Sequence, residues 1–275
     1  MKSANVYGLV LSGGASRRMQ HDKAALPYQD VPQLQRACEL LATCCTRVFV
    51  SARADQQQDE LRKRWPLIVD QQQELGPLAG IAAAQAAHSD VAWLVIACDL
   101  PLLNPQTLQR LLQQRDATHI AIAFRDAEQQ PEPLCALWEP TSASLVRNAI
   151  AAGQYSPRRL LQSCATLLVD PLDPATLSNV NTTDEYRQAN TTLNSMLTLQ
   201  LQYFAIFREQ AGKRSESWST QATTPAEIYA ELQQRYGFKL NREQLKVAVN
   251  NEFCEWQQPL KSGDSIAFIP PVAGG

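Results

Sequence analysis

Short apolar runs alternate with longer helix-like runs from Val6 to about Val180. The apolar runs are continuous rather than alternating, which is typical of strands that are buried on both faces of a parallel sheet. Strands are expected at Val6–Leu11, Arg47–Ser51, Ala92–Ala97 and Ile120–Phe124, and helices at Gln33–Ala42, Gly80–Ala87 and Pro105–Gln114. This order of elements predicts an α/β domain with a mostly parallel sheet and helices on both of its faces.

A different pattern begins at Leu197, where apolar residues alternate with polar ones at the period of two that a half-buried strand requires. Thr224 and Pro225 then open a helix as its N-cap and first residue, and Gly237 ends it. Further strands are expected at about Leu245–Asn250 and at Ser265–Ile269. The order strand, strand, helix, strand, strand predicts a small α+β unit of the ubiquitin-like β-grasp type.

A polar and weakly patterned stretch separates these two regions of the chain. We place a linker at residues 190–196, after a first domain at residues 1–189 and before a second at residues 197–275. The length of 275 residues suits two units, since a domain commonly holds about 150 residues.

The composition is that of an ordinary globular protein, with 45% hydrophobic and 19% charged residues. A formal net charge of -2 argues against nucleic-acid binding, because phosphate neutralisation needs clustered Lys and Arg. The seven cysteines include no C-x-x-C pair, so neither a disulfide framework nor a zinc site is indicated. The first apolar run is too short for a signal-peptide core or a membrane span. We therefore expect a cytoplasmic protein that binds small molecules or proteins, and neither nucleic acid nor a membrane.

The first expected strand leads into a glycine loop crowded with cations. The loop contains Ser12, Gly13, Gly14, Arg17 and Lys23. Glycines let the backbone approach a polyphosphate, and Arg and Lys neutralise its charge, so this composition favours a triphosphate site. The spacing matches neither the ATPase loop G-x-x-x-x-G-K-[ST] nor the dinucleotide fingerprint G-x-G-x-x-G. A surface turn with solvated charges is the alternative, which the glycine pair alone does not exclude.

A single carboxylate, Asp99, follows the apolar run Ala92–Ala97 and precedes Pro101. Ligands of open α/β sheets bind at the carboxyl ends of the strands, so Asp99 is expected to face the same crevice as Gly13 and Gly14. One carboxylate together with substrate phosphates is the usual way in which proteins hold Mg²⁺. The alternative is that Asp99 only begins a turn.

Two further segments carry weaker signals. Asp70 ends an apolar run before the turn at Gly76–Gly80, and it is a candidate for binding a base or a ribose. Asn179 and Asn181 lie on the same side of an extended segment. The alternatives are ordinary loop punctuation at the first segment and, at the second, a turn before a final helix that Thr182 or its neighbour caps.

These segments together form an ordered set of motifs. They are Leu11-Ser12-Gly13-Gly14-x-Ser16-x-Arg18-Met19 with Asp22-Lys23, Gly76-Pro77-Leu78-Ala79-Gly80, Cys98-Asp99-x-Pro101 and Asn179-x-Asn181-Thr182. Over about residues 5–187 the chain therefore resembles the molybdenum cofactor guanylyltransferases, the MobA family, which has a Rossmann-like nucleotidyltransferase fold. The sequence departs from the family at Gln20, where glycine is common, at Tyr28–Pro32, which lacks a Gly-Lys pair, and at Ser51, where asparagine is common.

The resemblance implies the substrates GTP and molybdopterin, with Mg²⁺ bound by Asp99. It implies nucleotide contacts from Leu11, Ser12, Gly13, Gly14, Lys23, Ser51, Asp70 and Asp99, catalytic roles for Lys23, Asp99 and Arg17, and a pterin side lined by Asn179 and Asn181. The implied reaction is in-line attack of the terminal phosphate of molybdopterin on the α-phosphorus of GTP, with release of pyrophosphate.

The second domain carries its own set of motifs. They are Leu201-Gln202-Tyr203-Phe204-Ala205 with Arg208-Glu209-x-Ala211-Gly212, Ala248-Val249-Asn250, Leu260-Lys261-Ser262-Gly263-Asp264, and the ending Pro270-Pro271-Val272-Ala273-Gly274-Gly275. Residues 197–275 thus resemble the small subunit of molybdopterin synthase, the MoaD family. The resemblance implies that an E1-like adenylyltransferase activates Gly275, that its carboxylate becomes a thiocarboxylate, and that the tail delivers sulphur inside the large synthase subunit. A frayed terminus is the alternative for a bare Gly-Gly ending.

Three aromatic residues of this domain are candidates for either the core or a docking surface. They are Phe204, Phe253 and Phe268, and we expect at least two of them in the core because large aromatics dominate small cores. For the first domain two other functions stay open: a cytidylyl- or sugar-nucleotidyltransferase, or an inactive scaffold for the sulphur carrier. The presence of Lys23, Asp70 and Asp99 argues against the scaffold.

Overall fold

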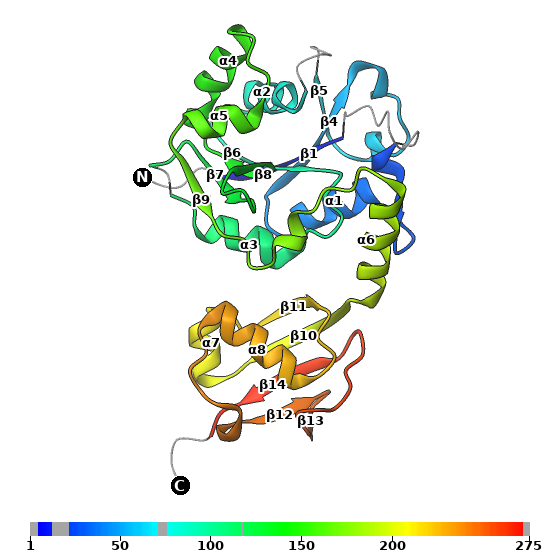
Figure 1. Cartoon of the computed structure of the whole chain (residues 1–275), viewed down its shortest axis with the longest axis vertical. Coiled ribbons are helices and arrows are strands. Elements are labelled where there is room, and N and C mark those ends of the chain that lie inside the picture. Colours follow the sequence, from blue (N-terminus) through cyan, green and yellow to red (C-terminus); the bar gives the residue numbers. More distant parts are fainter. Residues whose placement is uncertain (1–4, 13–21, 71–75, 117, 272–275) are drawn as a thin grey trace. The chain divides into compact units, whose positions relative to one another are not determined.

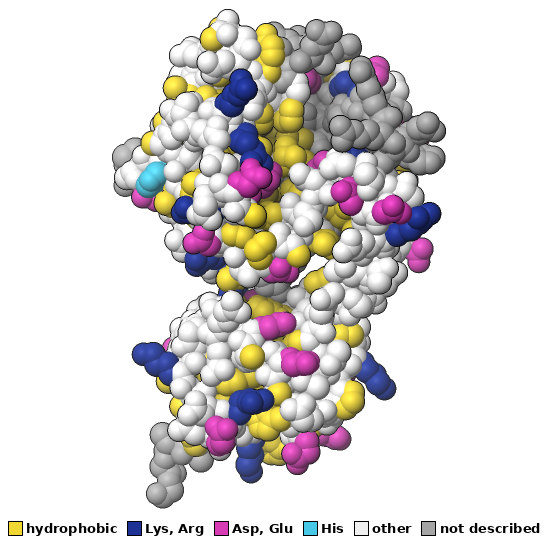
Figure 2. All heavy atoms as spheres, viewed as in Figure 1, with side chains coloured by type: hydrophobic (Ala, Val, Ile, Leu, Met, Phe, Trp, Pro, Cys, Tyr) yellow, Lys and Arg dark blue, Asp and Glu magenta, His cyan; other side chains and the backbone are white. Residues whose placement is uncertain are grey.

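The computed structural model describes residues 5–12, 22–70, 76–116 and 118–271. The chain divides into two compact units, Met1–Asn190 and Thr191–Gly275, which are traced in Figure 1. Figure 2 shows cationic and anionic side chains interspersed over the visible face of each unit, in keeping with the small net charge. Along the described residues, no helix combines the length and the apolar content that crossing a bilayer requires.

A seven-stranded sheet in the order β5-β4-β1-β6-β8-β7-β9 forms the centre of the first unit. Its strands are β1 (Val6–Leu11), β4 (Arg47–Arg53), β5 (Leu67–Asp70), β6 (Ala92–Ala97), β7 (Ala121–Arg125), β8 (Pro131–Trp138) and β9 (Thr166–Val169). All neighbouring pairs are parallel except those that β8 makes with β6 and β7. A two-stranded hairpin, β2 (Pro27–Tyr28) and β3 (Val31–Pro32), lies outside this sheet. The predicted α/β fold with a mostly parallel sheet is confirmed.

No strand is predicted from the sequence at β8, although this strand is almost wholly buried. Its first three residues are Pro131, Glu132 and Pro133, and prolines in a run argue against a central strand. The register of β7 against β8 shifts between Ala123 and Phe124, so the proline-containing end pairs beyond a bulge.

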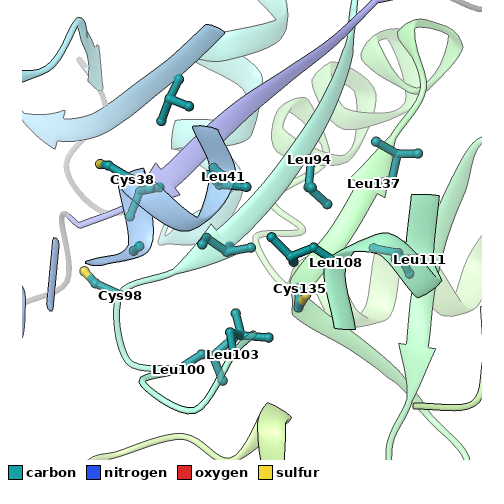
Figure 3. Close-up of a cluster of buried hydrophobic side chains, with 14 of the residues drawn as sticks. Cys38, Leu41, Leu94, Cys98, Leu100, Leu103, Leu108, Leu111, Cys135 and Leu137 are labelled. Atoms are coloured by element: carbon teal, nitrogen blue, oxygen red, sulfur yellow. The ribbon is translucent and has the colours of Figure 1, made fainter. Parts of the chain in front are cut away.

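Helices cover both faces of the sheet in Figure 1. The helices of this unit are α1 (Gln33–Ala42), α2 (Pro77–Ala87), α3 (Pro105–Gln113), α4 (Ala143–Ala151), α5 (Pro157–Ser163) and α6 (Thr183–Ser195), and the first five cover the sheet. Apolar residues of α1 and α3 form one core cluster with the sheet, and those of α2, α4 and α5 form a second with its other face. Figure 3 shows Cys38 and Leu41 of α1 and Leu108 and Leu111 of α3 among the side chains of the first cluster, together with Leu94 of β6.

Short 3-10 turns complete the connections. They are η1 (Lys23–Ala25), η2 (Ala54–Gln56), η3 (Arg62–Arg64), η4 (Pro140–Ser142), η5 (Pro174–Leu177) and η6 (Arg242–Gln244).

The segment that the sequence marks as a linker, residues 190–196, is helical as far as Ser195. A capping box starts this helix, since the Glu185 amide donates to Thr182 Oγ1 at 3.2 Å and the Glu185 carboxylate accepts from the Thr182 amide at 2.9 Å. Ala189 and Leu193 are buried one turn apart on one face of α6. Two apolar residues are too few to reveal a helix in a polar sequence.

The second unit is a five-stranded sheet in the order β11-β10-β14-β12-β13 with the helix α8. Its elements are β10 (Leu197–Tyr203), α7 (Ala205–Ala211), β11 (Ser215–Thr220), α8 (Pro225–Tyr236), β12 (Lys246–Val249), β13 (Glu252–Cys254) and β14 (Ser265–Ile269). The central pair β10 and β14 is parallel. Thr224 caps α8 in a capping box with Glu227, and Gly237 ends it with a φ of 66°. The predicted β-grasp unit is confirmed, while α7 and β13 are additions to it.

The expectation that at least two of three phenylalanines lie in the second core is wrong. Phe268 is 2% exposed, but Phe204 is 49% exposed and Phe253 is 67% exposed. Phe204 is the residue before α7, and Phe253 lies in β13 at the edge of the sheet, where Lys246 Nζ lies 5.3 Å from its ring centroid. The core uses Phe207 and Tyr229 instead.

Candidate active site

The carboxyl ends of four parallel strands meet at one edge of the first sheet. In the register of β1, Leu11 pairs with Ser51 at the end of β4 and with Ala97, the last residue of β6. Arg53 pairs with Asp70, the last residue of β5. The sheet topology thus brings predicted site residues from distant parts of the chain to a common edge.

Lys23, Asp99 and Asn181 lie together at this edge. Lys23 Nζ donates to Asn181 Oδ1 at 2.6 Å and to Asp99 Oδ2 at 3.3 Å. The Val180 amide also donates to the Asp99 carbonyl at 2.8 Å, which fixes the residue between the two asparagines against the end of β6. Three residues that the sequence proposes from separate segments therefore form one cluster.

Two buried oxygens, one in this cluster and one two residues before Asn181, have no hydrogen-bond partner in the part of the chain that the structure describes. They are Asp99 Oδ1 and Asn179 Oδ1. A buried acceptor left unpaired costs free energy, and such groups mark positions where a ligand or an ion completes the bonding. A carboxylate oxygen is a donor that Mg²⁺ prefers, so Asp99 fits the ion that the sequence implies.

Groups of three or more His, Cys, Asp or Glu side chains arranged around a metal position are absent from residues 5–12, 22–70, 76–116 and 118–271. Magnesium commonly binds through one or two carboxylates together with substrate phosphates. Asp99 with a bound triphosphate would supply such a set.

Ser12 and Asp22, the described residues on either side of residues 13–21, both contact Arg62. Ser12 is 3% exposed, and its hydroxyl donates to the Ser51 carbonyl at 2.8 Å. Arg62 donates to Ser12 Oγ at 3.1 Å and pairs with the carboxylate of Asp22. Burial raises the pKa of Asp22, but the hydrogen bonds and charge of Arg62 outweigh burial and hold this pKa below 3.8. Asp22 is therefore ionised at neutral pH.

Arg62 is a site residue that the sequence analysis misses. It stands in the run Asp59-Glu60-Leu61-Arg62-Lys63-Arg64, which has the composition of a solvated surface turn. Only the structure shows that this one guanidinium is buried.

Gly80 lets α2 approach the strand ends closely. A Cβ at this position would lie 2.4 Å from Ser51 Oγ and 3.0 Å from Leu11 Cδ2. Gly76, at the start of the same helix, has a φ of 61°, which favours glycine. The segment Gly76–Gly80 is thus shaped by packing against the end of the sheet.

The thiol of Cys98 is not a nucleophile in this arrangement. Burial and the neighbouring Asp99 carboxylate raise its pKa to about 12. Cys98 Sγ donates to the Leu11 carbonyl at 3.3 Å, so the neutral thiol ties β6 to β1.

An acidic group lies on the adjoining strand β8. Burial raises the pKa of Glu132, whose carboxylate accepts from the Leu134 amide at 2.9 Å and lies 3.6 Å from Arg158. The charge of Asp99 adds to this rise, which relates Glu132 electrostatically to the cluster.

The described residues include Leu11, Ser12, Lys23, Ser51, Asp70, Asp99, Asn179 and Asn181 among those that the sequence proposes. Gly13, Gly14, Arg17 and Gly275 lie outside the described residues.

Family models match both units. A model described as MobA-like NTP transferase domain matches residues 8–167, and the ThiS family model matches residues 201–275. The bifunctional molybdenum cofactor biosynthesis protein of Synechocystis sp. is 37% identical over 186 residues, which are 67% of this chain and 54% of that protein. The chain thus spans about half the length of this relative. The molybdenum cofactor guanylyltransferase of Xanthomonas euvesicatoria is 34% identical over 65% of this chain and 91% of its own length.

Solved structures share the fold of the first unit. Molybdopterin-guanine dinucleotide biosynthesis protein A from Archaeoglobus fulgidus aligns with a TM-score of 0.59 and 22% identity, over 68% of this chain and 98% of that one. A 4-diphosphocytidyl-2C-methyl-D-erythritol synthase from Anaerococcus prevotii aligns with a TM-score of 0.53 and 8% identity, over 70% and 96%. The fold alone therefore does not select the nucleotide.

Proposed function

This chain belongs to the family of MobA-like NTP transferases through residues 8–167, and on that premise we propose that its first unit transfers GMP from GTP to molybdopterin in its molybdenum-loaded form. The observation that carries the proposal is the Lys23–Asp99–Asn181 cluster with its unpaired carboxylate oxygen. The names of the guanylyltransferase relatives support GTP as the nucleotide.

The proposed reaction is an in-line substitution. An oxygen of the terminal phosphate of molybdopterin attacks the α-phosphorus of GTP, the bond to the α,β-bridging oxygen breaks, and pyrophosphate leaves with that electron pair. Protein groups form no covalent bond in this scheme, so catalysis depends on positioning and charge stabilisation.

The residues of the proposed site have different roles in this reaction. Lys23 supplies a cation that Asp99 and Asn181 already hold in place. Asp99 Oδ1 would hold Mg²⁺, which when bound neutralises charge on the phosphate oxygens. Contacts with GTP are assigned to Leu11, Ser12, Gly13, Gly14, Ser51 and Asp70, an additional cation to Arg17, and the pterin side to Asn179 and Asn181.

The second unit is proposed to carry sulphur as a thiocarboxylate at Gly275. Its match to the ThiS family and its β-grasp sheet support this role. The partners would be an E1-like adenylyltransferase, which activates the carboxylate, and the large subunit of molybdopterin synthase, which receives the tail. All seven cysteines are free thiols, which suits a reducing compartment such as the cytoplasm.

Nucleotide preference tests the first proposal against a cytidylyl- or sugar-nucleotidyltransferase. A ligand at about 100 times its Kd stabilises the folded state by about 2.7 kcal/mol. For a unit of this size such stabilisation raises Tm by about 5–10 °C. GTP with Mg²⁺ is expected to give this shift in the wild type and not in Asp99→Asn. A shift given by CTP or another triphosphate, with none from GTP, would replace the guanylyltransferase with another transferase of the fold.

Intact mass tests the second proposal. The full chain is incubated with the E1-like partner, ATP and a sulphur donor, beside a chain that lacks Gly275. Replacement of one oxygen by sulphur on the full chain alone is the expected result. An unchanged mass with an active partner would contradict the carrier role.

A further inference from the structure

One cation of the first unit is buried outside the cluster just described. The side chain of Arg62 is 1% exposed, whereas the neighbouring Lys63 and Glu60 side chains are 45% and 80% exposed. Arg62 is the first residue of η3, in the connection between β4 and β5. A buried guanidinium loses its hydration, so it persists only where acceptors replace water.

Ser12, Asp22 and Asp59 supply acceptors for the Arg62 side chain. Arg62 Nε donates to Ser12 Oγ at 3.1 Å, and Nη2 donates to the Ser12 carbonyl and to Asp22 Oδ1, each at 2.9 Å. Nη1 donates to Asp22 Oδ2 at 2.7 Å and lies 3.3 Å from Asp59 Oδ1. Four of the five N–H groups of the guanidinium donate these hydrogen bonds, and Nη1 also lies beside the carboxylate of Asp59.

The two loop partners of Arg62 flank the segment 13–21 in the sequence. Ser12 directly follows β1, and Asp22 caps η1 by accepting from the Ala24 amide at 3.1 Å. Because Nη2 contacts both of them, one side chain joins the two described residues on either side of this segment. Lys23 directly follows Asp22, so the contacts of Arg62 with Asp22 also fix the backbone position of Lys23.

We propose that Arg62 is a positioning residue for triphosphate binding. It clamps Ser12 to Asp22 and thereby holds Ser12 and Lys23 in the positions from which they contact GTP. The proposal rests on the proposed nucleotidyltransferase function. Arg62 is not itself a phosphate ligand, because four of its donors are engaged and the two carboxylates of Asp22 and Asp59 more than balance its charge. Lysine cannot replace it, since an ammonium group lacks the planar fork that bonds a carboxylate and a carbonyl at once.

Arg115 provides a matched control for a change at Arg62. It forms a comparable two-bond pair with Glu139, at 2.6 and 2.8 Å, and both side chains are largely buried. Glu139 follows Trp138, which pairs with Trp93 near the start of β6, so this pair lies at the opposite edge of the sheet from Asp99. Arg62→Met and Arg115→Met are both expected to lower Tm.

The measurement is KM for GTP in the full chain, determined separately from kcat. Arg62→Met is expected to raise KM for GTP by about 10- to 100-fold, as displaced binding groups do, while Arg115→Met keeps the wild-type KM. Arg62→Lys should recover part of the Tm but little of the affinity. An unchanged KM in folded Arg62→Met would overturn the clamp.

Asp22→Asn keeps the proposal testable if Arg62→Met does not fold. Its side chain is 39% exposed, so this change is milder, and KM should rise in the same direction. In the double variant the two effects on KM should not add, because both changes break one contact. Additive effects would overturn the clamp. A wild-type chain without GTP turnover would instead contradict the proposed function, and the clamp with it.

Discussion

Lys23 Nζ donates a 2.6 Å hydrogen bond to Asn181 Oδ1, which joins residues 158 positions apart in the sequence. The same amine contacts Asp99 Oδ2 at 3.3 Å. The cation is therefore held before a nucleotide arrives, and little reorganisation is needed when phosphates bind.

Asp99→Asn should lower turnover at least about 100-fold, because the amide has lost the charge that holds a divalent ion beside the phosphates. The fold should persist, since Asp99 is partly exposed and keeps its backbone bond to Val180. Steady-state pyrophosphate release is the measurement, with Asp184→Asn as control because that side chain is 91% exposed. Full activity in Asp99→Asn would contradict the proposed role of Asp99 in binding Mg²⁺.

Asn181→Asp should raise KM for GTP. The new carboxylate would lie beside Asp99 and Lys23, so it would repel the triphosphate and bind the amine more tightly. Asn181→Ala removes the hydrogen bond without adding charge and should have a smaller effect on KM. KM values that fall in the reverse order would argue against phosphate binding next to Lys23.

Gly80→Ala should destabilise the first unit by about 1–3 kcal/mol, as overpacking commonly does. The added Cβ would meet Ser51 Oγ at 2.4 Å. Ser51→Ala in the same chain removes that atom and should recover part of the loss, which urea unfolding of the single and double variants can measure. If Gly80→Ala and the double variant are equally stable, a contact other than that with Ser51 Oγ causes the loss of stability.

Glu132→Gln should change how stability depends on pH. Burial raises the folded pKa of Glu132 above 4.5, so the protonated form is favoured in the folded state and stability falls as pH rises through the folded value. The variant does not titrate there, so its Tm should gain on the wild type as pH increases from 4.5. Glu128→Gln, at an exposed position, is the control and should leave the profile unchanged.

Phe253→Ser should alter the free energy of unfolding of the second unit by less than about 0.5 kcal/mol, because its ring is already in solvent. Phe268→Ala should cost about 3–5 kcal/mol, because its ring is fully packed in the core. Chemical denaturation measures both. A large loss in Phe253→Ser would mean that β13 contributes more to stability than its exposure indicates.

The sequence predicts most of the fold because buried parallel strands leave a strong apolar signal. The run Val6–Leu11 and the helix Gln33–Ala42 are found with their bounds. The apolar signal is missing at β8, because prolines interrupt this buried strand. It is also weak in α6, where Ala189 and Leu193 are the buried apolar residues among those that the structure describes. Local composition does not report what tertiary packing buries.

The candidate site follows the same division. Lys23, Asp99 and Asn181 are each marked by a motif, so the sequence proposes them, although only the sheet topology brings them together. Arg62 has no such mark, because an arginine in a charged turn has the same neighbours whether it is exposed or buried. Its role depends on contacts with Ser12 and Asp22, which are 50 and 40 positions away.

Product formation by the full chain is the most direct measurement of guanylyl transfer by the Lys23–Asp99–Asn181 cluster. Wild type and Asp99→Asn are each incubated with GTP, Mg²⁺ and molybdenum-loaded molybdopterin, and the guanine dinucleotide and pyrophosphate are quantified together. We expect equimolar formation of both products by the wild type and almost none by the variant. Wild-type protein that is folded yet forms no dinucleotide, or equal formation by both proteins, would contradict it.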